Sequence, residues 1–238
     1  MKENSDDRIY SLHLIENLPS FVRLKFLIDK IDKVSLPRAL QNELIENYSF
    51  AGDLLDFGGG EKSHNRSIIK CKTYQSINID PDINPTWVIG VDDPFPCDDE
   101  CFDHVFSFNT LEHVYNAYDK LSEFYRVLRT NGDILISTPF LYPIHGHPDD
   151  FFRPTPSWYY KALKNCGFKE IRVVPLFWGP FSTGLTTSGV GPFQNVRKKI
   201  ALFLDLLLVK YKQKKLTKSE IEQILMPTST VLAVQATK

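Results

Sequence analysis

The run DLLDFGGG is a short apolar stretch that contains Asp56 and ends on Gly58, Gly59 and Gly60. Glycines lack a side chain, so a turn made of them can adopt unusual backbone angles and approach a ligand closely. Asp80 ends the next apolar stretch. An acidic residue roughly 20 residues beyond such a turn can accept hydrogen bonds from both hydroxyls of a ribose. The pattern therefore predicts a site for an adenosine-containing ligand.

A second group of reactive side chains lies in residues 139–156, PFLYPIHGHPDDFFRPTP. Histidines, carboxylates, an arginine and several aromatic rings follow one predicted strand there, which is typical of a concave site. Four of these side chains carry donor atoms suited to a metal: His145, His147, Asp149 and Asp150. Because no more distant ligand is evident, we expect no metal site.

The elements that must position these residues follow an α/β pattern. Apolar runs bounded by turn residues alternate with stretches of helical period, which is typical of a mainly parallel sheet wrapped by helices. We expect seven strands, near 53–57, 75–79, 86–90, 103–108, 133–138, 169–175 and 230–236. In such a doubly wound domain, ligands lie beyond the carboxyl ends of the strands. The glycine turn, Asp80 and the loop at 139–156 should therefore meet at one edge of the sheet.

Helical periodicity and stop signals complete the expected domain. We predict helices over 18–31, 36–48, 116–129 and 156–166. The third of these is expected to end at Asn131-Gly132. Residues 1–50 should pack as N-terminal helices on a domain formed by 51–238, with an insertion at about 177–228 between the last two strands.

Further motifs follow the glycine turn in order. Residues 92–114 read DDPFPCDDECFDHVFSFNTLEHV, and residues 124–140 read FYRVLRTNGDILISTPF. Over about residues 50–175 the chain resembles the class I S-adenosylmethionine-dependent methyltransferases, and most of all the methyltransferase type 11-like domain. The resemblance implies a Rossmann-like, seven-stranded, mainly parallel sheet with a reversed last strand, a role to which 229–237 is suited. It also implies S-adenosyl-L-methionine as the cofactor.

A nicotinamide-dependent dehydrogenase is the main enzyme alternative for a glycine turn. Its fingerprint ends on a third glycine or alanine, but counting from Gly58 and Gly60 that position is Ser63. An acidic residue two positions before the first glycine, here Asp56, resembles the methyltransferase form. Lys62 stands where the methyltransferase family often has a further glycine, so the shape of the loop is less well defined than the class of cofactor.

The resemblance assigns the cofactor to residues at the strand ends: Asp56, Gly58, Gly59, Gly60, Asp80, Asp92, Asp93 and Asn109. Asp80 would hold the ribose, and either Asp92 or Asp93 would face the adenine amino group. The sequence does not separate these two. Asn109 would approach the methionine end, and Glu112 and His113 behind it either face the site or cap the next helix.

The loop at 139–156 is expected to face the methyl group. A sulfonium carbon is already electrophilic, so the enzyme mainly aligns the nucleophile and removes a proton where one is held tightly, as in a hydroxyl. Histidine titrates near neutral pH, so His145 or His147 is a candidate base that Asp150 could orient. Resemblance to methyltransferases of glycan and cell-surface polysaccharide pathways favours His145.

That resemblance rests on the pattern His-x-x-Pro-x-Asp-Phe/Tyr-x-Arg-x-Thr, which this chain meets from His145 to Thr155. His113, His147 and Arg153 are expected on the substrate side. The alternative is a structural lid, in which Asp150 and Arg153 pair across a turn.

The insertion at 177–228 begins with a loop rich in Gly, Pro, Ser and Thr, which could close over a substrate. A helix around 194–213 follows, with apolar residues flanked by lysines and arginine. It is shorter than the roughly 20 apolar residues that cross a bilayer. We expect it to contact a membrane surface, a second copy of the chain in a homodimer, or its own sheet.

Composition bounds the remaining choices. The chain has 238 residues, 42% of them apolar, and a formal net charge of −1 with both signs dispersed, so no nucleic-acid partner is expected. The polar start MKENSDDR favours a cytoplasmic protein. Two functions stay open: methylation of a sugar or glycan hydroxyl or of another small-molecule acceptor, and a methyltransferase-like scaffold or binding subunit. The cofactor pattern favours the enzyme.

Overall fold

The computed structural model describes residues 18–146, 149–188 and 191–238. Its centre is a seven-stranded sheet in the order β3-β2-β1-β4-β5-β7-β6. The strands are β1 (Asp53–Phe57), β2 (Thr73–Asn78), β3 (Trp87–Val88), β4 (Phe102–Phe108), β5 (Leu128–Pro139), β6 (Lys169–Leu176) and β7 (Val231–Thr237). Strand β7 runs antiparallel to both β5 and β6, whereas the other pairs are parallel. The predicted sheet with a reversed last strand is confirmed.

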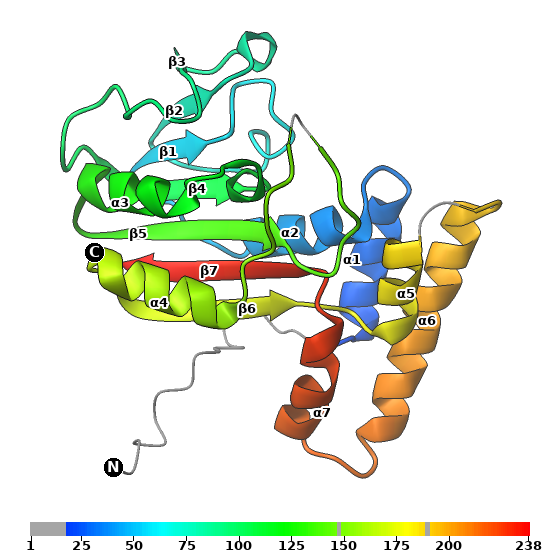
Figure 1. The fold of residues 1–238 in the computed structure, drawn as a ribbon. Coiled ribbons are helices and arrows are strands. Elements are labelled where there is room, and N and C mark those ends of the chain that lie inside the picture. The colour runs from blue at the N-terminus through cyan, green and yellow to red at the C-terminus, as the bar shows by residue number, and fades with distance from the viewer. Residues whose placement is uncertain (1–17, 147–148, 189–190) are drawn as a thin grey trace, which may run out of the picture.

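Helices cover both faces of this sheet (Figure 1). They are α1 (Phe21–Ile31), α2 (Leu36–Glu46), α3 (Ala117–Val127), α4 (Pro156–Cys166), α5 (Pro180–Ser188), α6 (Gln194–Lys212) and α7 (Lys218–Leu225), with short 3₁₀ helices at Pro81–Ile83, Leu111–His113 and Met226–Thr228. Helices α3 and α4 lie over one face, and α1, α2 and α6 pack against the other. The sheet is therefore doubly wound, as predicted.

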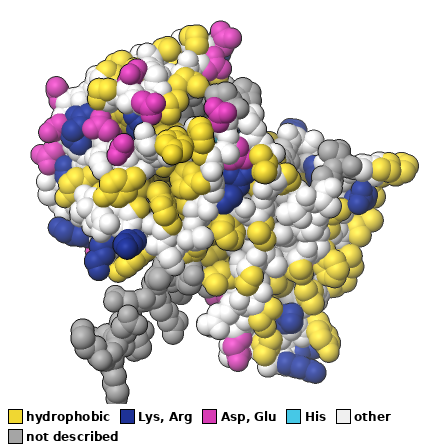
Figure 2. Space-filling view, viewed as in Figure 1, with side chains coloured by type: hydrophobic (Ala, Val, Ile, Leu, Met, Phe, Trp, Pro, Cys, Tyr) yellow, Lys and Arg dark blue, Asp and Glu magenta, His cyan; other side chains and the backbone are white. Residues whose placement is uncertain are grey.

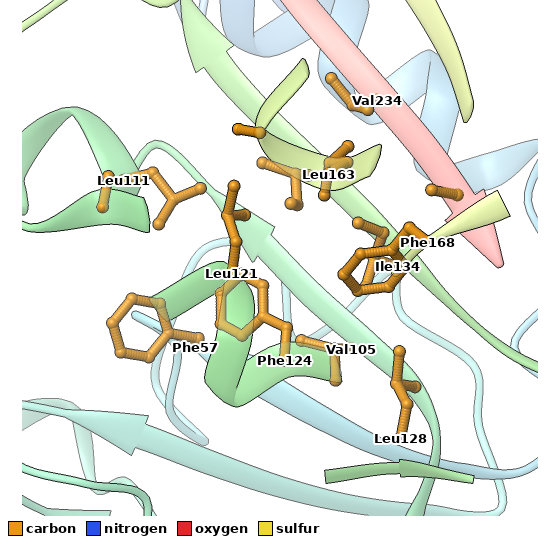
Figure 3. Packing of buried hydrophobic residues seen from close by; sticks show 14 of the residues in the cluster. Phe57, Val105, Leu111, Leu121, Phe124, Leu128, Ile134, Leu163, Phe168 and Val234 are labelled. Atoms are coloured by element: carbon orange, nitrogen blue, oxygen red, sulfur yellow. The ribbon is translucent and has the colours of Figure 1, made fainter. Parts of the chain in front are cut away.

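The two cores follow from the alternation of side chains along each strand. Leu54 packs in the cluster that includes α1, α2 and α6, whereas its neighbour Leu55 packs in the cluster that includes α3 and α4. Figure 3 shows Leu121 and Phe124 of α3 lying against Val105 of β4. Because helices bury both faces of the sheet, a ligand can reach it only at the ends of its strands.

Local signals set most helix boundaries. The Ser35 side chain accepts a hydrogen bond from the backbone N–H of Arg38, which begins α2. Thr155 accepts one from the backbone N–H of Trp158 and begins α4, and Gly167, with φ of 101°, ends it. The helices predicted at 36–48 and 156–166 therefore lie at those positions.

The helix predicted over 116–129 is shorter than expected. It ends at Val127, because Leu128 already has extended backbone angles and pairs with Phe102 as the start of β5. The guanidinium of Arg129 then binds Asp53 at 2.9 Å and Asp103 at 2.8 Å. Pairing between strands outweighs the helical period of the sequence here.

The first part of the insertion, predicted as a loop, instead contains α5. The Asp205 carboxylate accepts hydrogen bonds from the backbone N–H groups of Phe181 at 3.0 Å and Ser182 at 2.9 Å. Two donors of the first turn of α5 are thereby satisfied from α6. Trp178, just before α5, is fully buried and donates its indole N–H to the carbonyl of Leu202. This segment packs on the protein and is not an open flap.

Candidate active site

One cleft of about 870 Å³ runs along the carboxyl ends of the first four strands. Its wall takes Gly58 from the turn after β1, Asp80 from the turn after β2, Asp92 from the loop after β3, and Asn109 from the end of β4. These are four of the predicted cofactor residues. Since ligands of open α/β sheets bind at this edge, the cleft is the candidate cofactor site.

The three glycines are required by close contacts within the protein. A Cβ on Gly58, whose φ is 92°, would lie 1.9 Å from the hydroxyl oxygen of Thr110, and one on Gly59 would lie 1.8 Å from a carboxylate oxygen of Asp56. At Gly60 the obstacle is the carbonyl oxygen of Ile83, at 2.5 Å. Gly58 lies in the wall of the cleft, whereas Gly59 and Gly60 support the turn from behind.

Asp56 lies beneath this turn and is only 3% exposed. Tyr74 donates its hydroxyl hydrogen to the carboxylate at 2.7 Å. Burial raises the pKa of Asp56 to about 7, although the Tyr74 hydrogen bond opposes the shift. Asp56 is not among the residues that form the wall, and its predicted role at the cofactor stays a prediction.

Asp92 and Asp93 lie in different surroundings. Asp93 accepts a hydrogen bond from the backbone N–H of Gly90 at 2.7 Å, and its own carbonyl accepts one from the Lys120 ammonium at 2.7 Å. These bonds hold Asp93 in a turn. Asp92 lies in the wall of the cleft. Asp80, also in the wall, accepts the backbone N–H of Asp82 and begins the 3₁₀ helix there.

Asn109 is fixed by a residue that the sequence analysis did not identify. Its side-chain amide exchanges two hydrogen bonds, of 2.8 and 3.0 Å, with the amide of Gln41 in α2. Gln41 also donates to the Ser137 hydroxyl of β5 at 2.9 Å. Asn109 has a φ of 55°, in the left-handed region. The ends of α2, β4 and β5 are thus tied together at the floor of the site, and no local signal in the sequence connects Gln41 with Asn109.

Three polar side chains meet at the β4 end of the cleft. Glu112 is fully buried, and neither of its carboxylate oxygens has a hydrogen-bond partner among the described residues. His113 Nε2 lies 3.7 Å and His145 Nε2 lies 4.0 Å from its Oε1. Burial raises the pKa of Glu112 to about 8. His113 lies in the wall of the cleft, so this cluster borders the site.

Each histidine of the cluster is held through its other ring nitrogen. Nδ1 of His113 donates to the carbonyl of Asp149. Nδ1 of His145 lies 3.3 Å from Oδ2 of Asp150 and 3.3 Å from the carbonyl of Pro143. At His113 this acceptor places the hydrogen on Nδ1 and leaves the lone pair of Nε2 on the side of Glu112. At His145 the two nearer neighbours of Nδ1 are acceptors and favour the same tautomer, and Nη2 of Arg153, a donor, lies at 3.5 Å.

Asp150 and Arg153 hold the loop that carries His145. The guanidinium of Arg153 binds both carboxylate oxygens of Asp150, with Nη2 at 2.6 Å from Oδ2, and the backbone N–H of His145 donates to Oδ2 at 2.9 Å. Arg153 also holds the pKa of Asp150 down at about 2. The structure therefore brings together His145, Asp150 and Arg153. His147 lies outside the described residues.

Comparison with known proteins identifies the fold and finds a partial match to one domain model. Residues 55–136 match the model of a methyltransferase domain. No curated protein matches the chain. A chain of the Haloferax volcanii complex that contains the Trm112 methyltransferase activator is similar at a TM-score of 0.54 and 16% identity, over 91% of this chain and 94% of that one. An S-adenosylmethionine-dependent methyltransferase from Archaeoglobus fulgidus is similar at a TM-score of 0.53 and 15% identity, over 85% of this chain and 93% of that one.

A further match is to phosphoethanolamine N-methyltransferase 2 of Haemonchus contortus, at a TM-score of 0.49 and 15% identity. It covers 83% of this chain but 52% of that one, so the chain spans about half the length of this relative. At such identities the solved structures establish the fold, and the domain model matches about a third of the chain.

Residues 55–136 are thus similar to a methyltransferase domain, and the chain has the fold of the S-adenosylmethionine-dependent methyltransferases.

The matched part of the methyltransferase domain and the catalytic candidates overlap only in part. The glycine turn, Asp80, Glu112 and His113 lie within residues 55–136, whereas His145 lies beyond it. His145, Asp150 and Arg153 thus come from a loop that the family model does not include. Substrate specificity is expected in such a loop, since loops vary on a fixed scaffold.

Sequence reasoning missed several residues in the wall of the methyltransferase cleft. Thr110 directly follows Asn109, so the prediction of Asn109 at the strand end could have been extended to it. Tyr115 and Phe151 form an edge-to-face pair with ring centroids 5.6 Å apart, and both lie in the wall. Tyr115 directly follows the run 92–114, so its position after β4 was the available signal. Arg38, which also lies in the wall, comes from α2, and no signal in the sequence pointed to it.

Proposed function

We propose that the chain transfers a methyl group from S-adenosylmethionine to a small-molecule acceptor, with the cofactor bound in the 870 Å³ cleft. The observation that carries this proposal is that Gly58, Asp80, Asp92 and Asn109, from four different strand ends, lie in one wall. Asp80 accepts the ribose hydroxyls, Asp92 faces the adenine amino group, and the methionine end lies towards Asn109.

The order of the strands gives the cofactor its direction. Asp80 follows β2, whereas Asn109 follows β4, on the other side of β1. A cofactor with its ribose at Asp80 and its methionine near Gly58 therefore directs its methyl group towards the β4 and β5 ends. His113, Asp149 and Phe151 form the wall there. This is the end at which the acceptor binds.

We infer further that the acceptor is a hydroxyl group of a sugar or glycan. A hydroxyl holds its proton tightly and needs a base, and His145, whose Nδ1 lies 3.3 Å from Asp150, is the candidate beside the cleft. The acceptor oxygen forms its bond to the methyl carbon as the carbon–sulfur bond breaks. The electron pair stays on sulfur, and the hydroxyl proton moves to Nε2 of His145. The exposed rings of Tyr115 and Phe151 offer a surface on which a sugar can stack.

The experiment is transfer of labelled methyl from S-adenosylmethionine to a panel of glycan and other hydroxyl and amine acceptors. Once an acceptor is found, His145→Ala should lower turnover by about 10²- to 10⁴-fold while leaving cofactor affinity unchanged. His104→Gln is the matched control, because His104 is bound to Asp133 in the sheet, away from the cleft. Unchanged turnover in His145→Ala would remove His145 as the base. Labelling of amines alone would overturn the hydroxyl assignment.

We also propose that α6 lies against an anionic membrane surface. Beyond its buried face, α6 exposes a stripe of apolar side chains at helical spacing: Val196, Ile200, Phe203, Leu204, Leu207 and Tyr211. Lysines and arginine flank it: Arg197, Lys198, Lys199, Lys210, Lys212, Lys214 and Lys215. Figure 2 shows apolar side chains along the right-hand edge over α6, with basic side chains beside them. No helix in the described residues is long and apolar enough to cross a membrane. The pattern is that of a helix lying in the interface.

A second copy of the chain is the alternative occupant of this surface. The charge on α6 disfavours it, because two copies packed through the same face would bring their lysines together. An acceptor carried on a lipid would suit the membrane position. The third predicted contact, with the protein's own sheet, is made by the opposite face of α6, through Leu202 and Leu206.

A further inference from the structure

We propose that Glu112, His113 and His145 bind one divalent transition-metal ion at the methyl end of the cleft. In the sequence, the possible metal donors were recognised only within residues 139–156. In the folded protein His145 meets two residues from the 3₁₀ helix after β4 instead, about thirty positions earlier in the chain. The set of donors is two imidazoles and one carboxylate, which zinc accepts in catalytic sites.

The donor atoms have the spacing of a metal site. His113 Nε2 and His145 Nε2 lie 3.7 and 4.0 Å from Oε1 of Glu112, and all three donors lie within 4.8 Å of one another. Two ligands that are each about 2.1 Å from a metal lie roughly 3.4 Å apart in tetrahedral and about 4.2 Å apart in trans geometry. The donor atoms lie near or slightly beyond these separations, so small shifts of the side chains would close the site around an ion.

Glu112 by itself points to a cation. The side chain is 0% exposed, and Oε1 and Oε2 both lack hydrogen-bond partners among the described residues. A buried carboxylate without a partner is costly, and native proteins normally satisfy such groups. Arg153, the nearby cation, is engaged with both oxygens of Asp150. A metal ion bound to Glu112 would supply the missing partner.

The outer contacts are those that metal-binding histidines require. Nδ1 of His113 is held by the carbonyl of Asp149, and Nδ1 of His145 by the carboxylate of Asp150. Such contacts fix the tautomer, orient the ring and raise the basicity of the ligating Nε2. Here they direct two lone pairs to one point beside Glu112. The rings themselves lie edge to face, with centroids 5.2 Å apart.

Access and metal type follow from the same residues. His113 and Asp149 lie in the wall of the cleft, so solvent and a ligand reach the site from there. Three protein ligands leave at least one position for an oxygen from outside, as in catalytic zinc sites. Two nitrogen donors favour Zn²⁺ or Co²⁺ over Mg²⁺, which prefers oxygen ligands.

The ion changes how a hydroxyl acceptor would be activated, and this consequence alone rests on the proposed function. Nε2 of His145 holds either a proton or a metal, so a bound ion replaces its role as base. An acceptor hydroxyl on the open position would have a lowered pKa and release its proton to water. Its oxygen then forms the bond to the methyl carbon, and the carbon–sulfur electron pair stays on sulfur.

The test uses the full chain and the metal alone. Zn²⁺ is titrated in competition with a chromophoric chelator, and Co²⁺ is followed by its visible absorption, which reports nitrogen ligation. We expect one ion per chain and a loss of affinity of at least about 100-fold in Glu112→Gln, His113→Asn and His145→Asn. His104→Gln should keep the affinity of the natural chain. Circular dichroism checks that each variant is folded.

Several results would overturn the site. The first is no binding of Zn²⁺ below millimolar concentration. The second is an affinity in all three variants equal to that of the natural chain. The third is a Co²⁺ spectrum that Glu112→Gln and His145→Asn leave unchanged. These readouts use neither cofactor nor acceptor. A chain that binds zinc but no S-adenosylmethionine would therefore refute the proposed function and keep the metal site, and the reverse result would do the opposite.

Discussion

At the scale of single residues, the site depends on carboxylates that differ in environment. Asp80 is exposed in the wall of the cleft, Asp56 is buried beneath the glycine turn, and Glu112 is buried beside two histidines. Asp150 is held ionised by Arg153. Exposure allows Asp80 to bind a ligand directly, whereas burial gives Asp56 a structural role. Substitutions at these positions therefore have different expected effects.

Asp80→Asn tests the assignment of the ribose. Loss of the charge weakens two hydrogen bonds to the ribose hydroxyls, and bonds to a charged group contribute about 1.5 to 3 kcal/mol. We expect the Kd for S-adenosylhomocysteine to rise by about 10- to 100-fold in calorimetry. Asp82→Asn is the matched control, since Asp82 is exposed two positions further on and outside the wall. Equal affinities in both variants would refute the role of Asp80.

Asp56 predicts a pH dependence of stability. Its pKa is raised to about 7 in the folded protein from the ordinary value of 3.8 for an aspartate. Between these values the folded state binds more protons than the unfolded state, so the free energy of unfolding falls as pH rises and levels off above about pH 7. One pKa unit corresponds to about 1.4 kcal/mol, so the loss is up to about 4 kcal/mol.

The measurement is urea unfolding of the natural chain and of Asp56→Asn at several pH values. The amide cannot ionise but can still accept the Tyr74 hydrogen bond. The free energy of unfolding of the variant should therefore rise relative to that of the natural chain as pH rises from 4 to 8. A difference between the two that stays constant across this range would show that Asp56 has an ordinary pKa.

At the scale of elements, α6 has two faces with separate roles. Its buried face packs on the core through Leu202 and Leu206, and Asp205 on that side holds the first turn of α5. Its other face is apolar, exposed and bordered by lysines. The insertion is thus anchored by one face, which leaves the other free to contact a membrane.

Ile200→Gln with Leu207→Gln tests that contact. Both side chains are about half exposed, at 53% and 47%, so the change should leave folding intact. We expect binding to vesicles that contain phosphatidylserine to fall at least about tenfold, because each buried side chain contributes on the order of 1.5 kcal/mol or more. Tyr118→Gln, on α3 over the opposite face of the sheet, is the control. Absence of vesicle binding by the natural chain, or a dimer that the double variant dissociates, would refute the membrane proposal.

Asp205→Ala tests the anchor of the insertion. The change removes the acceptor of two backbone N–H groups at the start of α5, in a position with no exposure. We expect a loss of about 1 to 3 kcal/mol in the free energy of unfolding, measured by urea denaturation. Asp205→Asn keeps one acceptor oxygen and should recover part of the loss. Equal stability of the Ala variant and the natural chain would show that α5 needs no such cap.

At the scale of the whole molecule, the order of strands brings the candidate residues together. The sequence predicted the strands and the glycine turn well, because apolar runs and turn residues are local signals. It overextended the helix that ends at Val127, where pairing of Leu128 with Phe102 decides the boundary. It also missed Gln41 beneath Asn109 and the meeting of Glu112 with His145, since these contacts join distant segments. Burial of Glu112 follows from the packing of the whole chain and has no local signature.

Calorimetry of the full chain with S-adenosylmethionine and S-adenosylhomocysteine tests the central claim most directly. The claim is that the cleft formed by Gly58, Asp80, Asp92 and Asn109 holds this cofactor. We predict one site per chain for each compound, with affinity reduced in Asp80→Asn. Absence of binding by both compounds at millimolar concentration would contradict the claim and leave a methyltransferase fold that serves as a scaffold.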